Sequence, residues 1–189
     1  MKSIFRKIFL YTLLATSSAC YASINTSQVL TIAPPRPIDD PELYAVRPAT
    51  IQCVIAAAHK YNNPANILLA ISSMESGKNG QVVKNTNGSY DMGHFQINTI
   101  HWEGNKFDGV IEIDYHDVAQ RGCYNAALAS WILKKRLLEN SGVDYWTKVA
   151  NYHSKTEKFN SIYKRKLIPL AIEWGKWLER NGQFVVTYK

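Results

Sequence analysis

The sequence predicts a mainly α-helical (α+β) fold, in which a single helical domain carries one small β-hairpin. Three observations support this fold class. Apolar residues recur at helical spacing along most of the chain, and the pair Asn87-Gly88 interrupts them with a hairpin signal. Hydrophobic residues make up 46% of the 189 residues, which suits one domain with a sizeable core.

Residues 1–22 have the pattern of a secretory signal. Their basic start contains Lys2, Arg6 and Lys7. Residues 8–15 are apolar but too few to span a bilayer comfortably, and Cys20-Tyr21-Ala22 is a small-x-small cleavage site. We therefore expect a periplasmic protein with no stable transmembrane segment after cleavage. The alternatives are an uncleaved membrane anchor and a lipoprotein signal at Cys20, where Ser17 replaces the usual leucine.

Residues 23–47 are expected to form an extended arm with little core of its own. Four prolines fall within it, at positions 34, 35, 37 and 41. The arm is interpreted as a linker, and a tether to a larger assembly is the alternative. The predicted domain then covers residues 48–180, and residues 181–189 are left as a loose tail.

Five helices are predicted within this domain. They cover residues 48–61, 64–75, 114–139 (or from 117), 145–152 and 159–180, the last with a possible kink at Pro169. Between the second and third helices, Asn87-Gly88 lies between Val82-Val83 and Ser89-Tyr90. This arrangement predicts a β-hairpin closed by a type I′ turn.

Glu75 is the most informative residue of the second helix. An apolar stripe on this helix contains Ile67, Leu68, Ile71 and Met74, and Glu75 falls on the same stripe. Gly77 is expected to end the helix. The C-terminal end of the helix dipole and the apolar surroundings both disfavour a charged carboxylate, so we expect a raised pKa that suits a general acid. The alternative is a glutamate at a frayed helix end that faces solvent.

Glu75 belongs to a set of motifs. Glu75-Ser76-Gly77 ends the helix, residues 89–98 have the sequence Ser-Tyr-Asp-Met-Gly-His-Phe-Gln-Ile-Asn, and residues 150–154 have the sequence Ala-Asn-Tyr-His-Ser. Together, residues 48–174 resemble the catalytic domain of the soluble lytic transglycosylases, the lysozyme-like enzymes of glycoside hydrolase family 23. His94-Phe95 replaces the usual Leu-Met, which puts the shape of the sugar groove in question. Only Tyr152 matches securely in the last motif.

The resemblance implies a lysozyme-like fold and a substrate, the glycan strands of peptidoglycan. Glu75 would protonate the oxygen between N-acetylmuramic acid (MurNAc) and N-acetylglucosamine (GlcNAc), and would then act as the base that closes a 1,6-anhydro ring. The implied substrate-binding residues are Ser76, Ser89, Tyr90, Gly93, Gln96, Asn98 and Tyr152. Tyr90 and Trp102 are candidate groove walls. The sequence of residues 89–98 also resembles that of specialised family members that open the cell wall for secretion, conjugation or pilus systems. The resemblance therefore implies that components of such a system are candidate partners.

A glycosidase that uses water needs a second carboxylate, and none lies in a comparable motif. The best candidate is Asp91, ahead of Glu103, Asp108, Glu112 and Asp114. A goose-type lysozyme therefore remains an alternative, as does an inactive peptidoglycan-binding assembly protein. The five histidines lack metal-ligand spacing, no motif implies a cofactor, and no basic run with interleaved aromatics indicates nucleic acid.

Two cysteines, Cys53 and Cys123, remain once the signal is removed. In an exported chain, two cysteines favour one disulfide. It would join the first helix of the domain to the long central helix, and two buried free thiols are the alternative.

Overall fold

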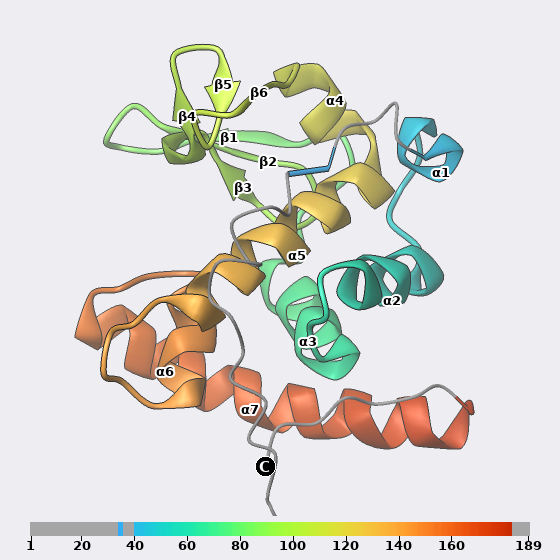
Figure 1. The fold of residues 1–189 in the computed structure, drawn as a ribbon, viewed down its shortest axis with the longest axis vertical. Helices are drawn as coiled ribbons and strands as arrows, with labels where there is room; N and C mark the ends of the chain where they lie inside the picture. The colour runs from blue at the N-terminus through green and yellow to red at the C-terminus, as the bar shows by residue number, and fades with distance from the viewer. Residues whose placement is uncertain (1–33, 36–39, 183–189) are drawn as a thin grey trace, which may run out of the picture. The chain divides into compact units, whose positions relative to one another are not determined.

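The computed structural model describes residues 34–35 and 40–182, which form a mainly helical fold with two small antiparallel sheets (Figure 1). The predicted fold class is thereby confirmed. The expected signal, most of the arm and residues 183–189 of the tail lie outside the described residues. Within the described part of the chain, no helix is both long and apolar enough to cross a membrane.

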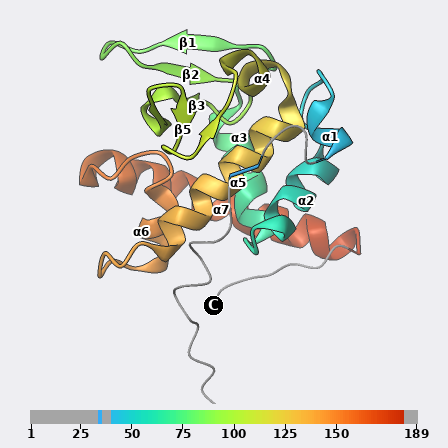
Figure 2. The same cartoon turned by 45° about the horizontal axis from the view of Figure 1, so that its top comes forward.

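The helices are α1 (Pro41–Tyr44), α2 (Ile51–Lys60), α3 (Ala65–Glu75), α4 (Tyr115–Gln120), α5 (Gly122–Leu138), α6 (Tyr145–Ala150) and α7 (Glu157–Arg180). Helix α5 runs through the centre of the fold in both ribbon views (Figures 1 and 2). It packs against α1, α2, α4 and α6, while α3 packs against α2 and α7. Residues 122–133 of α5 are all buried, as expected of a helix enclosed by others.

Helix α3 is buried more completely than an apolar stripe predicts. Residues 65–71 are all buried, and only the last turn, which carries Glu75, approaches the surface. Asn66 donates a hydrogen bond to the carbonyl of Ala171 in α7 (3.1 Å), next to the buried Gly175. The small residues of α7 thus let the two helices approach closely, and this contact fixes the start of α3 against α7.

The single helix predicted from Asp114 or Asp117 to Glu139 is wrong, because the chain breaks at Arg121. This residue is extended (φ −101°, ψ 91°), and it separates α4 from α5. A Cβ on Gly122 would lie 2.1 Å from the backbone nitrogen of Ala49, and the Gly122 N–H bonds the carbonyl of Arg47 (2.8 Å). The break therefore lets the chain before α2 cross tightly over the start of α5.

The helix boundaries differ from the sequence predictions in two further places. The expected arm contains α1, which is capped by Asp40 and buries Leu43. The first predicted helix begins at Ile51, because Thr50 caps it, and not at Pro48. Helix α7 continues through Pro169, whose side chain is exposed.

The predicted hairpin is part of a three-stranded sheet, and its turn is not type I′. Strands β1 (Val82–Lys84), β2 (Tyr90–Met92) and β3 (Ile97–Asn98) pair in that order. A type I′ turn needs positive φ at both central residues, but of Asn87 and Gly88 only Gly88 has it (φ 85°). Gly88 N–H bonds the carbonyl of Asn85 (3.1 Å), and Asn85 N–H bonds that of Ser89 (2.8 Å). The loop is therefore three residues long.

A second sheet was not predicted from the sequence. It consists of β4 (Trp102–Glu103), β5 (Lys106–Phe107) and β6 (Ile111–Glu112), and it follows a 3₁₀ turn, η3 (Thr99–His101). Two-residue strands are too short to produce an alternating pattern in the sequence. Phe107 and Ile111 anchor this sheet in the core.

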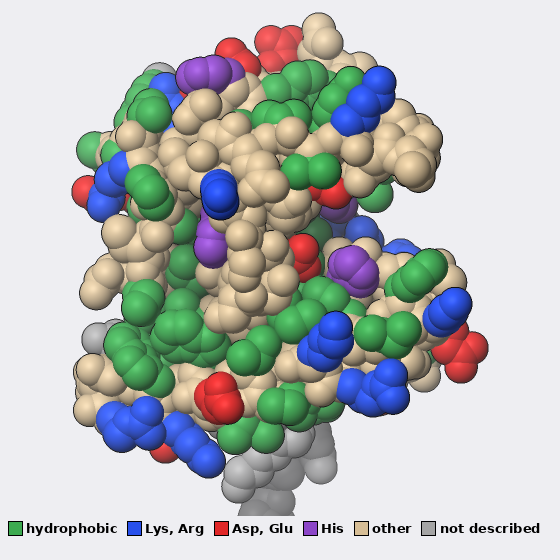
Figure 3. Space-filling model, turned by 180° about the vertical axis from the view of Figure 1, so that it is seen from behind, with side chains coloured by type: hydrophobic (Ala, Val, Ile, Leu, Met, Phe, Trp, Pro, Cys, Tyr) green, Lys and Arg blue, Asp and Glu red, His purple; other side chains and the backbone are tan. Residues whose placement is uncertain are grey.

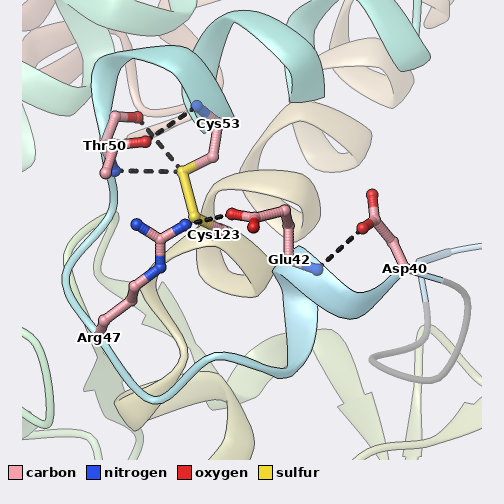
Figure 4. Close-up of polar contacts among 6 residues, drawn as sticks. All are labelled: Asp40, Glu42, Arg47, Thr50, Cys53 and Cys123. Atoms are coloured by element: carbon pink, nitrogen blue, oxygen red, sulfur yellow. Dashed lines mark hydrogen bonds and ion pairs between the residues drawn. A yellow bond between two sulfur atoms is a disulfide. The ribbon is translucent and has the colours of Figure 1, made fainter.

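The disulfide between Cys53 of α2 and Cys123 of α5 is confirmed, with the two Cα atoms 5.5 Å apart. Figure 4 shows its surroundings, including Thr50, whose hydroxyl accepts the Cys53 N–H at the start of α2 (3.2 Å). An ion pair between Arg47 and Glu42 lies beside it. The disulfide thus fixes α2 to the central helix.

Candidate active site

The end of α3, which carries Glu75, has an unusual backbone. Ser76 is left-handed (φ 48°, ψ 25°), a conformation that costs a residue with a side chain roughly 1 kcal/mol. The helix ends before Gly77, as expected, but Ser76 and not Gly77 takes the left-handed conformation. A glycine is required at position 77 because a Cβ would lie 2.2 Å from the carbonyl oxygen of Gly93 and 2.3 Å from Nε2 of Gln96. The motif Glu-Ser-Gly therefore joins the helix end tightly to the loop 93–96.

Glu75 is partly buried and has one partner that sequence reasoning missed. Tyr163 of α7, which is buried, donates a hydrogen bond from Oη to Glu75 Oε1 (2.7 Å). Burial raises the pKa of Glu75 to about 7, the Tyr163 bond lowers it, and the negative charge of Asp91 raises it. The expected raised pKa is thus present, and its largest cause is desolvation. Near neutral pH, Glu75 can therefore hold a proton on one oxygen while the other is fixed by Tyr163.

Asp91 lies on β2 and is held by two amides. Asn85 Nδ2 donates to Oδ2 (2.9 Å) and Asn98 Nδ2 donates to Oδ1 (2.6 Å). Both amides also contact the Ser89 hydroxyl, each at 3.1 Å. Ser89 and Asn98 were predicted to bind sugar, and the structure places them around Asp91. The network fixes a negative charge that acts on Glu75.

Tyr90 lies on the other face of the sheet from Asp91, because side chains alternate along a strand. With Met92, Val82 and Tyr115 it lines a cavity of about 500 Å³ that extends to α4. Tyr90 thus lines this cavity next to α4, and its role as a groove wall stays a prediction. Trp102 packs edge-on against Phe107 (ring centroids 4.8 Å apart) and Tyr115 (5.1 Å), which makes it an anchor of the second sheet.

The loop 93–96 depends on Asn125, a buried residue of α5 that the sequence did not single out. Its side chain donates to the carbonyl of Met92 (3.0 Å) and accepts from the N–H of Phe95 (2.7 Å). Gly93 has a φ of 66°, and a Cβ there would lie 2.6 Å from the Asn125 amide. Gln96, also left-handed (φ 50°), donates to the carbonyl of Gly93 (2.7 Å). Gly93 and Gln96 thus shape the loop that packs on Gly77.

Tyr152 and His153 complete the surroundings of Glu75. Tyr152 donates to the carbonyl of Phe95 (3.1 Å), and its pKa is raised by burial and by the charges of Glu75 and Asp91, so it remains a donor. The exposed His153 stacks on the Tyr163 ring with centroids 4.7 Å apart and planes 5° from parallel. Desolvation lowers the pKa of His153, although Asp91 acts in the opposite direction. His153 therefore covers the tyrosine that holds the acid.

His94 and Phe95 occupy different environments. Phe95 is fully buried in the core. His94 is partly buried, and its ring nitrogens contact Ser72 Oγ (2.6 Å, Nε2) and the carbonyl oxygen of Gly77 (2.8 Å, Nδ1). Phe95 therefore belongs to the core, and His94 contacts the end of α3 through both ring nitrogens.

The space-filling view from behind shows a hollow on one side of the domain, between its upper and lower parts (Figure 3). Acidic and histidine side chains are visible near its inner edge. By their place in Figure 1, the sheets border this hollow above and the α6–α7 region borders it below. The first sheet supplies Asp91 and α7 supplies Tyr163, and both act on the pKa of Glu75.

The functional residues missed by sequence reasoning are Tyr163, Asn85 and Asn125. Tyr163 follows Asn160 and precedes Leu167 on the buried face of α7, so its spacing indicates a core aromatic. The one available signal was its hydroxyl, since a buried tyrosine usually needs a hydrogen-bond partner. Among the described residues, no cluster of three or more histidine, cysteine or acidic side chains could hold a metal ion.

Comparison with known families places this geometry in context. The model of the transglycosylase SLT domain matches residues 52–166, more than half of the chain. The match includes Glu75, Asp91, Gln96, Tyr152 and Tyr163. A comparison with curated proteins found no match.

Proposed function

The chain belongs to the transglycosylase SLT-domain family, and on that premise we propose that it is a lytic transglycosylase that cleaves the β-1,4 bond between MurNAc and GlcNAc with formation of 1,6-anhydroMurNAc. The family supports lytic-transglycosylase-type activity on peptidoglycan, and its domains act outside the cytoplasm. The observation that carries the proposal is Glu75: a partly buried carboxyl group with a pKa of about 7, held by Tyr163.

In the first step, Glu75 acts as the general acid. Tyr163 donates to Oε1, which leaves Oε2 to carry the proton toward the glycosidic oxygen. A group whose pKa lies near the working pH transfers a proton efficiently in both directions. As the C–O bond breaks, the acetamido oxygen of MurNAc attacks the anomeric carbon, and the negative charge of Asp91 stabilises the positive charge that develops.

In the second step, the same carboxylate acts as the base. Glu75 removes the proton from the 6-hydroxyl of MurNAc, and the resulting oxygen attacks the anomeric carbon and closes the anhydro ring. The acetamido group is released unchanged, and Glu75 regains its proton. An intramolecular hydroxyl has a large effective concentration relative to water when the groove holds the sugar in a reactive geometry.

A goose-type lysozyme is the second candidate, and the geometry of Asp91 weighs against it. Hydrolysis needs a second carboxylate that acts as base or nucleophile. Both oxygens of Asp91 already accept hydrogen bonds, from Asn85 and Asn98. A carboxylate held in this way is better suited to an electrostatic role than to accepting a proton from water. An inactive wall-binding protein is disfavoured by the intact Glu75 and Tyr163 pair.

The setting we propose is the periplasm, where the protein would open the wall locally for a secretion, conjugation or pilus apparatus. The support is the resemblance of residues 89–98 to the specialised members of the family and the secretory pattern of residues 1–22. Components of that apparatus would be its partners, and the glycan strand its substrate.

Digestion of purified sacculi tests the proposed chemistry. The wild-type protein should release soluble muropeptides, and Glu75→Gln should lower the rate by roughly a hundredfold or more, because the amide keeps the size but cannot donate the proton. Glu173→Gln, at an exposed position of α7, is the matched control and should keep full activity. Full activity of Glu75→Gln would show that the acid lies elsewhere.

A further inference from the structure

His94 forms a bridge across the helix turn that carries Glu75. Its Nε2 contacts the Ser72 hydroxyl (2.6 Å), three residues before Glu75, and its Nδ1 contacts the carbonyl oxygen of Gly77 (2.8 Å), two residues after it. The backbone adds a third link, because the N–H of Gly77 donates to the carbonyl of His94 (3.0 Å). One residue thus binds both sides of the same turn.

The chemistry of these contacts fixes the tautomer of the neutral imidazole. A carbonyl oxygen can only accept, so Nδ1 must carry a hydrogen and donate it to Gly77. In the neutral ring, Nε2 is then an acceptor, and the Ser72 hydroxyl is its donor. Every polar atom of the ring is therefore used to hold the end of α3.

The turn needs such support. Ser76 lies in the left-handed region, and strained residues of this kind persist only where the surroundings hold them. The Glu75–Tyr163 bond also requires that the last turn of α3 keep its position against α7, because the tyrosine is fixed in the core. Residues at a helix end fray readily unless they are held by tertiary contacts.

We propose that His94 is a positioning residue for Glu75, which it acts on by clamping Ser72 and Gly77 on either side of the acid. His94 does not touch the reacting atoms. Its role is to keep Glu75 within hydrogen-bond reach of Tyr163 and at a constant distance from the glycosidic oxygen. The inference rests on the proposed role of Glu75 as the acid.

Three variants separate the contacts of His94. His94→Leu removes both side-chain bonds while keeping apolar bulk. His94→Asn keeps a donor near the position of Nδ1 and so retains the Gly77 bond. Ser72→Ala removes only the bond to Nε2 and is the mildest change. His59→Leu, at an exposed position of α2, is the matched control for the loss of a histidine.

Two readouts distinguish positioning from a purely structural role. The first is turnover of soluble glycan strands, where kcat for His94→Leu should fall roughly tenfold or more with KM nearly unchanged, because a displaced acid slows chemistry more than binding. Ser72→Ala should lower kcat about fivefold, the effect of one net hydrogen bond. His94→Asn should recover most of the loss, and His59→Leu should behave as wild type.

The second readout does not depend on turnover. Carbon-13 NMR of the glutamate carboxyl groups should give a pKa for Glu75 near 7 in the wild-type protein and a value closer to an ordinary glutamate in His94→Leu, since a loosened turn admits water. His94→Asn should restore the wild-type titration. Melting temperatures should be measured for each variant, so that loss of fold is not counted as loss of position.

The results can overturn the inference in two ways. Wild-type kcat and Glu75 titration in both His94→Leu and Ser72→Ala would show that the clamp is not needed. A lower melting temperature with unchanged kcat and titration would assign His94 a stabilising role alone. If Glu75→Gln stays active, the proposed acid fails, while the NMR titration still reports whether His94 holds the Glu75 turn. If His94→Leu does not fold, Ser72→Ala and His94→Asn decide the question.

Discussion

Tyr163 donates a 2.7 Å hydrogen bond to Oε1 of Glu75, which lies 88 residues earlier in the chain. The bond joins the end of α3 to the buried face of α7, the longest described helix. It fixes one carboxyl oxygen and leaves the other free for proton transfer. It also lowers the pKa of Glu75, against the larger effect of burial. This opposition keeps the pKa near 7, where one group can serve as acid and then as base.

Tyr163→Phe tests this relationship with little change in packing. The ring keeps its stack with His153, but Glu75 loses the bond that lowers its pKa, so the pKa should rise further above 7. The alkaline limb of the pH–rate profile should therefore move to higher pH, and kcat should fall about fivefold because the carboxyl is less well oriented. Tyr115→Phe, at an exposed position, is the control. An unchanged profile would mean that the bond has no role in tuning the acid.

Asp91→Asn tests the second influence on Glu75. The negative charge of Asp91 raises the pKa of Glu75, so its removal should move the alkaline limb of the pH–rate profile to lower pH. Turnover below pH 6 should fall by about tenfold, because Asp91 transfers no proton in the proposed mechanism but its charge stabilises the positive charge that develops. A loss of two or more orders of magnitude, with a hydrolytic product in the wild type, would make Asp91 a general base.

The raised pKa of Glu75 predicts a pH-dependent cost to stability. The folded pKa of about 7 exceeds the ordinary value of 4.5, so the folded state binds more protons. The cost is absent below pH 4.5, grows between pH 4.5 and 7, and is complete above pH 7. Discounted for partial exposure, it is about 2 kcal/mol. Glu75→Gln removes it.

Thermal melts of wild type and Glu75→Gln at pH 4 and pH 8 measure this effect. The melting temperature of Glu75→Gln minus that of wild type should be about 5 °C larger at pH 8 than at pH 4. Glu173→Gln, at an exposed position of α7, is the control and should not reproduce this difference. An equal difference at the two pH values would mean that the Glu75 carboxyl titrates normally.

The disulfide predicts a further stability difference. Cys53 and Cys123 are separated by 70 residues, and opening a loop of this length by the double change to alanine should cost about 4 kcal/mol on the chain-entropy model. Urea unfolding measures the change, and kcat of the folded variant should stay near wild type. Alkylation followed by peptide mapping should find both cysteines unreactive in the oxidised protein. Labelled Cys53 and Cys123 peptides would contradict the bridge.

The position of Glu75 could be predicted from the sequence because its environment is mostly local. The spacing from Leu68 and Ile71 placed Glu75 on the buried side of a helix end. That prediction used only residues within two helical turns of Glu75. The disulfide was predicted from the number of cysteines that remain in a chain expected to be exported. Local periodicity and composition were sufficient for both.

Other features depend on contacts between distant segments. Tyr163 looks like a core aromatic until α7 is packed on α3. The sequence predicts that Tyr90 lies on a strand within the matching motif. It does not predict which face of the sheet the Tyr90 side chain takes, because a shift of one residue in the strand register reverses the face. The break at Arg121 arises because residues 47–49 cross over Gly122, and nothing in the local sequence of α4 and α5 signals that crossing.

The sugar end of the released products tests the proposed chemistry most directly. Purified sacculi should be digested, and the soluble muropeptides analysed by mass spectrometry before and after borohydride reduction. The mechanism predicts products that end in 1,6-anhydroMurNAc: each is lighter by one water than the hydrolytic product, and borohydride leaves it unchanged. Muropeptides that carry the extra water and are reduced at the muramic end would show that water was the nucleophile, and would contradict the transglycosylase mechanism.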